Sequence, residues 1–276
     1  MLTAAAVDEA IERGVAWLLD EQRADGTWGS GSRAFGHSVL AAYALLHSGV
    51  EVEEKRFAKA IRWLDRHGPG LRRTRDKDAD TYSTALLVLL LRDRGLALEP
   101  RMRRAVAILA RSQAANGQWS YAPRSGKRGH DAGDNSNTQF AVLALGAAVG
   151  AGLPVDDETL RRAWTWWRTS AQKDGGFGYA SGGSKASAST GSMTAAGVAS
   201  IAILESARAG RATDTREEDE PTSRVLERAI ERLARGFEVD HNFGPAQGGV
   251  GQRQRKAGRG WLHYYLWSVE RAMVLA

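Results

Sequence analysis

The chain has 276 residues, of which 43% are hydrophobic, and its 38 Lys and Arg residues against 32 Asp and Glu residues give a formal net charge of +6. A chain of this length and apolar content can bury a large core. It has no cysteine, which excludes disulfides and thiolate metal sites. The longest purely apolar run, residues 85–91, is too short to span a bilayer, and Asp8 and Glu9 stand where a signal peptide would be apolar. These features predict a soluble protein of the cytoplasm.

Two kinds of predicted helix alternate along the chain. The first kind carries Arg and Glu on one side and is expected at residues 7–22, 55–67, 101–113, 157–172 and 222–238. Each is followed by a helix that is apolar nearly all round; these begin at His37, Tyr82, Asn137, Ser192 and His263. Helices that are apolar all round are buried, whereas amphipathic helices face solvent on one side. The pattern therefore predicts five hairpins, each with an outer and an inner helix.

Three of the outer helices end in the same way. Each closes on a glutamine, passes an acidic or amide residue followed by glycine, and reaches an aromatic residue: Gln22, Asp25, Gly26 and Trp28; Gln113, Asn116, Gly117 and Trp119; Gln172, Asp174, Gly175 and Phe177. Glutamine can hydrogen-bond free backbone groups, Asp-Gly and Asn-Gly favour a turn, and an aromatic ring can cover a helix end. We expect structural roles for these repeated residues.

Alternating outer and inner helices that stack with one handedness can close into a ring. We therefore expect one all-α domain over residues 1–276, an α/α toroid of about five outer/inner hairpins. The acidic run at 216–220 predicts a disordered acidic insertion over residues 208–222. Residues 240–260 are expected to form a basic, glycine-rich loop.

Several runs of the chain resemble a known family. DADTYSTALLVLLL, GQWSYAP, DNSNTQFAVLALGAA and YYLWSVERA are similar to the QW-motif repeats of the terpenoid cyclase and protein prenyltransferase superfamily, which includes squalene-hopene cyclases. Most closely they resemble bacterial prenyltransferase and squalene oxidase repeat proteins. The resemblance covers most of the chain and implies the same toroid. Relatives of that branch usually continue into a further hairpin after the YYLWSVERA helix, so the ring either closes with five hairpins or is incomplete.

The same resemblance bears on metals. The zinc prenyltransferases of this superfamily bind their metal through an Asp, a Cys and a His, and this chain has no cysteine. We therefore do not expect a zinc prenyltransferase, and we expect neither a metal nor a cofactor.

The first turns of the inner helices form the predicted site. In a barrel of parallel inner helices these turns converge on one mouth, where the positive helix ends also point. The candidate catalytic residues are Asp80, Tyr82 and His263, and the candidate ligand-binding residues at the mouth are His37, Asn135, Asn137, Ser192 and Tyr264. The alternative interpretation is that Ser38, Ser83, Asn135 and Thr190 are simply helix N-caps.

Basic residues gather on the same side of the predicted ring. The loops that precede the inner helices carry an excess of Lys and Arg, and the loops on the opposite side carry an excess of Asp and Glu. The rim candidates for ligand binding are Arg72, Arg73, Arg75, Arg124, Lys127 and Arg128. A positive rim over apolar walls suits a small anionic or amphiphilic ligand, such as an isoprenyl diphosphate or an anionic lipid. A solvated basic face is the alternative. No nucleic-acid partner is expected, because the loops lack interleaved aromatic residues and a recognised motif.

The resemblance implies one enzymatic function. Class II cyclases protonate an alkene with an acid of a DxDD motif at the start of an inner helix, and aromatic faces then stabilise the carbocation. The corresponding residues here are Asp78-Ala79-Asp80-Thr81, so the fourth acid is absent. Aromatic residues that could line the cavity are Phe35, Tyr43, Phe140, Trp261, Tyr264, Tyr265 and Trp267. Core packing is the alternative role for most of them.

Two other functions stay open. Polysaccharide lyases share the helical toroid, and Asn135, Asn137 and the rim arginines could neutralise a uronate while His263 or Tyr264 abstracts a proton. A toroid can also be a non-catalytic scaffold whose rim docks a protein. The residues therefore leave open whether the chain is an enzyme.

Overall fold

The helices follow the predicted order. The computed structural model describes residues 3–69, 80–121, 133–180, 187–209, 220–244 and 261–275. Over these residues the outer helices are α1 (Ala4–Asp20), α3 (Lys55–Arg66), α5 (Pro100–Ser112), α7 (Asp157–Ser170) and α9 (Glu220–Gly236). The inner helices are α2 (Ala34–His47), α4 (Thr81–Asp93), α6 (Asn135–Gly150), α8 (Gly191–Ala209) and α11 (Leu262–Leu275). A short 3-10 turn, Gly31–Arg33, leads into α2. The prediction of five outer/inner hairpins is confirmed.

The two predicted loops lie largely outside the described residues. Residues 210–219 of the acidic insertion and residues 245–260 of the basic loop are not among them. At the edges of the insertion, Arg208 and Ala209 continue α8, and Glu220 already belongs to α9.

Burial separates the two kinds of helix as the apolar pattern predicts. Most residues of α4, α6 and α8 are buried, whereas α1 has no buried residue. An inner helix has other helices on nearly every side, and an outer helix can bury only its apolar stripe. The core therefore lies between the inner helices and the inward faces of the outer ones.

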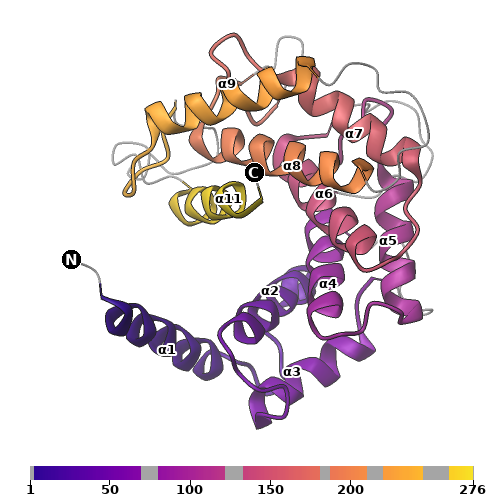
Figure 1. The fold of residues 1–276 in the computed structure, drawn as a ribbon. Coiled ribbons are helices and arrows are strands. Elements are labelled where there is room, and N and C mark those ends of the chain that lie inside the picture. The colour runs from indigo at the N-terminus through magenta and orange to yellow at the C-terminus, as the bar shows by residue number, and fades with distance from the viewer. Residues whose placement is uncertain are drawn as a thin grey trace.

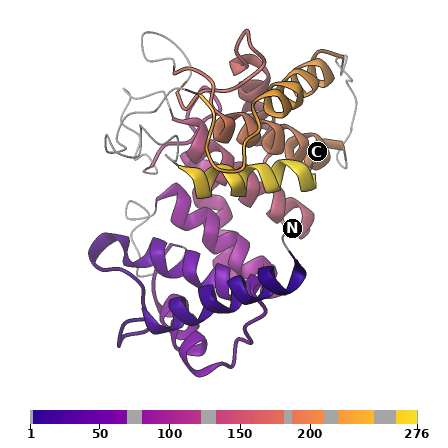
Figure 2. The ribbon, with the colours of Figure 1, turned by 90° about the vertical axis from the view of Figure 1, so that its left-hand side faces the viewer.

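The hairpins follow one another around an arc, with the outer helices on its convex side (Figure 1). The inner helices α2, α4, α6, α8 and α11 pack in this order, each against the next. Helix α11 lies on the inner side of the arc beside α8, and Figure 2 shows it between the N-terminal helices and the C-terminal ones. None of the helices in the described ranges combines the length and apolar character that a membrane crossing needs.

The inner helices run parallel. Near their starts, the hydroxyl of Ser136 on α6 donates to the Tyr264 hydroxyl on α11 at 2.9 Å. At their ends, Nε2 of His47 on α2 lies 3.0 Å from Oδ2 of Asp93 on α4. Since first turns contact first turns and last turns contact last turns, the inner helices begin on one face of the molecule, as the predicted mouth requires.

The repeated glutamine and aromatic residues hold the hairpins together. Nε2 of Gln113 donates to the carbonyl oxygens of Gly117, at 3.1 Å, and Thr159, at 2.9 Å. It thereby ties the turn after α5 to the first residues of α7. The indole of Trp119 covers the end of α5 and donates to the Leu109 carbonyl at 2.8 Å. Gln22 and Trp28 make equivalent bonds in the first hairpin, to the carbonyls of Gly26, Arg56 and Leu18.

Arginines connect consecutive outer helices. At each of the four joints, an arginine of the later helix bonds to the end of the earlier one or to the turn that follows it. The pairs are Arg56 with the Leu19 carbonyl and Asp20, Arg101 with the Leu64 carbonyl and Asp65, Arg162 with Gln113, and Arg232 with Asp174. These contacts hold the outer helices together on the convex side of the arc.

Candidate functional site

A buried carboxyl group stands at the start of α6. Asp134 is the N-cap of α6 and is 8% exposed. Its Oδ1 accepts from the Asn137 backbone N–H at 2.8 Å, and its Oδ2 accepts from Asn137 Nδ2 at 2.7 Å. Desolvation raises the pKa of Asp134, and the hydrogen bonds from Asn137 and Tyr179 oppose that rise. Asp134 is therefore held toward its neutral form more than a surface aspartate is.

The local sequence explains why Asp134 is buried. Its backbone N–H donates to the Trp119 carbonyl at 3.0 Å, which makes an isolated antiparallel bridge between these two residues. The next residue, Asn135, donates from its backbone to the Tyr179 carbonyl at 2.9 Å. Turn segments from two successive hairpins thus pack over the start of α6.

Four tyrosines surround Asp134 and its neighbour Ser136. The Tyr179 hydroxyl lies 3.2 Å from that of Tyr121, which is 57% exposed, and it is close enough to Asp134 to lower the pKa of that carboxyl group. The Tyr264 hydroxyl accepts from Ser136 and donates to the Gln139 side-chain oxygen at 2.5 Å.

Tyr82 completes this group of tyrosines. It packs against Tyr121 with ring centroids 5.5 Å apart, and Ser136 lies close enough to its hydroxyl to lower the pKa of Tyr82, against the larger rise that burial causes. Burial raises the pKa values of Tyr82, Tyr179 and Tyr264, so their phenols stay protonated near neutral pH.

Aromatic rings continue from the tyrosines along the inner side of the arc. Phe140 of α6 stacks on Trp267 of α11 with centroids 5.0 Å apart and on Tyr264 at 6.4 Å. Tyr82 meets Phe140 edge to face at 4.9 Å. These four residues, half-buried in the structure, form what we call the aromatic wall: Tyr82, Phe140, Tyr264 and Trp267. The site thus joins a buried acid to a row of aromatic faces, which can stabilise positive charge.

The predicted site residues are only partly brought together. Tyr82, Asn137 and Tyr264 belong to the Asp134 cluster. Asn135 is buried, and its side chain is engaged by the protein: Oδ1 accepts from Trp166 at 2.8 Å, and Nδ2 donates to the Gly178 carbonyl at 2.9 Å. These contacts give Asn135 a structural role next to the cluster.

The remaining mouth candidates lie elsewhere. Ser192 is buried and pairs with Asn242, whose Oδ1 accepts from the Ser192 backbone N–H at 2.8 Å. His37 and His263 are exposed. The six rim candidates, Arg72, Arg73, Arg75, Arg124, Lys127 and Arg128, lie outside the described residues.

Asp80, the predicted acid, is the N-cap of α4. Its Oδ1 accepts from the Ser83 backbone N–H at 2.8 Å, and Oδ2 forms a short bond with the Ser83 hydroxyl. It occupies on α4 the position that Asp134 occupies on α6. Asp134 and Tyr179 are not among the site residues predicted from the sequence. The one signal available was that Asp134 precedes an inner helix at the same register as Asp80.

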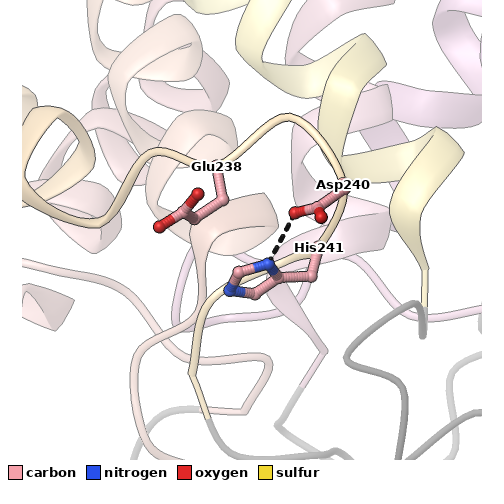
Figure 3. Close-up of side chains that lie close together, drawn as sticks. All are labelled: Glu238, Asp240 and His241. Atoms are coloured by element: carbon pink, nitrogen blue, oxygen red, sulfur yellow. Dashed lines mark hydrogen bonds and ion pairs between the residues drawn. The ribbon is translucent and has the colours of Figure 1, made fainter.

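A second group of ionisable side chains follows α9. Glu238, Asp240 and His241 each place one ligand atom within 4.8 Å of the others, and His241 Nδ1 lies 2.8 Å from Asp240 Oδ1 (Figure 3). All three belong to one short surface segment, with Glu238 and Asp240 exposed. Exposed acidic groups of this kind are common without an ion. We therefore assign no cation to this group.

Comparison with known proteins supports the fold. No protein-family model and no curated protein sequence matches the chain. Among solved structures, a polysaccharide lyase has a TM-score of 0.64 at 11% identity over 97% of this chain and 85% of its own. The type II terpene cyclase MstE from Scytonema has a TM-score of 0.56 at 17% identity over 86% of this chain. This chain spans 65% of the length of that cyclase.

A further similar structure is a UGL variant with dGlcA-Glc-Rha-Glc, with a TM-score of 0.56 at 14% identity over 97% of this chain and 80% of its own. MstE variants with geranylgeranyl dihydroxybenzoate as substrate and with merosterolic acid A as product have TM-scores of 0.51 and 0.53. Identities this low establish the fold alone. The chain is an all-helical α/α toroid, as predicted.

Proposed function

We propose that the chain binds an isoprenoid-like amphiphile along the aromatic wall and that Asp134 serves as the acid that protonates it. The observation that carries this proposal is the raised pKa of a buried carboxyl group beside stacked aromatic rings. An alkene is a weak base, so its protonation needs a carboxyl group that keeps its proton. Desolvation of Asp134 acts in that direction.

The aromatic wall supports the second half of the reaction. When the Asp134 proton adds to an alkene carbon, the neighbouring carbon becomes a cation, which ring closure moves along the chain. Faces of Phe140 and Trp267 stabilise such a charge through their quadrupoles. The cation is discharged by loss of a proton or by addition of water. The tyrosine hydroxyls around Asp134 stay protonated, so no phenolate lies beside Asp134 to take its proton.

Two aspartates offer a matched experiment. Asp80 and Asp134 cap neighbouring inner helices and each accepts from a backbone N–H at 2.8 Å. Asparagine is also a good N-cap, so Asp80→Asn and Asp134→Asn should both keep the cap bond to the backbone N–H. The two variants and the wild type are incubated with squalene, geranylgeraniol and geranylgeranyl diphosphate, and products are analysed by mass spectrometry.

The proposal predicts that Asp134→Asn lowers turnover by about 10²–10⁴-fold, the usual contribution of a general acid, while Asp80→Asn changes it little. Loss confined to Asp80→Asn would return the acid role to the residue predicted from the sequence. A wild type that converts none of these substrates would remove the cyclase function.

The lyase function has weaker support. Similarity to a polysaccharide lyase speaks for the fold alone, and the side chain of Asn135, expected to neutralise a uronate, is occupied by Trp166 and Gly178. Incubation with polyuronates and measurement of unsaturated-product absorbance tests this function separately. A chain that binds neither class of ligand would be the scaffold that the sequence left open.

A further inference from the structure

On each of two inner helices, one stripe of side chains is not completely buried. On α4 the stripe is Tyr82, Leu86, Leu89 and Asp93, whereas Val88 between them is fully buried. The spacing of four, three and four residues puts the stripe on one face of the helix. On α6 the same spacing recurs at Ser136, Phe140, Leu143 and Ala147. Because Phe140 belongs to the aromatic wall, we infer that both stripes border the inner side of the arc.

The helices on either side continue this surface. On α2, Leu40 is 52% exposed and lies one turn before Tyr43. On α11, Arg271 follows Trp267 by four residues and therefore shares its face. The middle of the surface is apolar, with the Asp134 cluster at the starts of the helices and a different set of polar residues at their ends.

Asp93 organises the polar end. Its side chain is 17% exposed, its Oδ2 lies 3.0 Å from His47 Nε2, and its Oδ1 accepts from Arg92 Nε at 2.5 Å. The ring of Tyr43 packs on the ring of His47 with centroids 4.4 Å apart. The carboxylate therefore holds an imidazole and a guanidinium side by side.

Arg271 brings α11 to the same cluster. Its pKa is raised, mainly by hydrogen bonds to Glu270 and further by Tyr43 and Asp93. The oxygens of Glu270 accept from Arg271, and those of Asp93 accept from His47 and Arg92. The acids are thus already occupied. The donors left to meet a ligand are the terminal nitrogens of Arg92, which make no hydrogen bond to a described residue.

The geometry points to a headgroup subsite at this polar end: Arg92, with His47 and Tyr43 beside it, binds the carboxylate or phosphate of an amphiphile whose apolar chain lies along the inner surface toward Asp134. This inference rests on the proposed function. Tyr82 and Asp93 are eleven residues apart on α4, so the two ends are separated by about 16 Å at 1.5 Å per residue. The ligand is then an isoprenoid whose anionic end and reacting end lie about that far apart. The sequence had placed the anionic group at the opposite, basic rim.

Binding of matched probes tests the subsite without requiring turnover. Farnesyl diphosphate and farnesol differ only in the diphosphate, and dodecanoate and dodecanol compare a carboxylate with its neutral analogue. Affinities are measured by calorimetry for the wild type, Arg92→Gln and the control Arg94→Gln. Arg94 follows Arg92 closely but bonds Asp65 of the outer helix α3. We expect Arg92→Gln to weaken the anionic probes by about tenfold, the size of one hydrogen bond to an ionised group, and to leave the neutral probes within about twofold.

Each other outcome has a separate meaning. Equal weakening of anionic and neutral probes, or none, would overturn the headgroup subsite while leaving the Asp134 chemistry untouched. Loss of anionic binding in the triple variant Arg72→Gln, Arg73→Gln, Arg75→Gln, with Arg92→Gln unaffected, would move the headgroup to the predicted rim and also overturn the subsite. If the wild type binds no probe, the aromatic wall and the proposed function fail together. Selective loss in Arg92→Gln with no turnover of any substrate would support the subsite and refute the acid role.

Discussion

Replacement of Gln113 by alanine tests whether the repeated glutamine is structural. The side chain makes three hydrogen bonds across a hairpin joint: to the carbonyls of Gly117 and Thr159, and from Arg162 Nε at 3.0 Å. At about 0.5–1.5 kcal/mol each, their loss lowers the free energy of unfolding by about 1.5–4.5 kcal/mol. A chain of this size loses about 2 °C in melting temperature per kcal/mol, so the expected decrease is about 3–9 °C.

Gln22→Ala is the matched control. Gln22 makes two such bonds, to the carbonyls of Gly26 and Arg56, and it follows α1, which buries none of its residues. Two bonds at the same rate give about 1–3 kcal/mol, and because the bond to Arg56 is exposed we expect the lower end of this range, about 1 kcal/mol. Urea denaturation followed by circular dichroism measures both variants. Equal losses, or a Gln113→Ala variant as stable as the wild type, would refute the argument that these bonds hold successive hairpins together.

Two further predictions follow from the backbone and from Asp134. Gly117 has φ of +92°, and a Cβ there would lie 2.2 Å from the Arg162 carbonyl oxygen, so Gly117→Ala should lower the free energy of unfolding by more than about 2 kcal/mol. Gly95 has φ of +73° but open space around it, so Gly95→Ala should lower it by only about 1 kcal/mol. The same denaturation assay measures both variants. Because the pKa of Asp134 is raised, its neutral carboxyl group favours folding at low pH, and this contribution is lost as pH rises through that pKa. The free energy of unfolding of Asp134→Asn should therefore rise relative to that of the wild type between about pH 4 and neutrality. A stability difference between the two proteins that shrinks with rising pH would contradict the raised pKa.

The helical hairpins were predictable because their signal is local. The apolar period of a helix, the glutamine at its end and the glycine of the turn all lie within about twenty residues of each other. Burial in the structure follows that pattern, from α1 with no buried residue to α6 with most of its residues buried. The expectation that Tyr82, Asn137 and Tyr264 gather at the helix starts came from the same register, and in the structure Tyr264 bonds Ser136 and Tyr82 packs against Phe140, both on α6.

The burial of Asp134, on which its proposed acid role rests, depends on other segments of the chain. Asp80 and Asp134 read alike in the sequence, since each precedes an inner helix and caps it. What distinguishes Asp134 is the turn around Trp119, fifteen residues earlier in its own hairpin, and Tyr179 of the next hairpin, which pack over its carboxyl group. A pKa shift by desolvation depends on such neighbours rather than on the residue itself.

The sequence by itself determined the all-helical toroid, the order of its outer and inner helices and the side on which the inner helices start, because these depend on hydrophobic periodicity and connection order. Only the tertiary structure decided which aspartate is desolvated, which aromatic rings stack, and that His47, Arg92 and Asp93 meet at the far end of the inner helices. Those features arise from contacts between residues many positions apart, and distance in space sets electrostatic and packing energies.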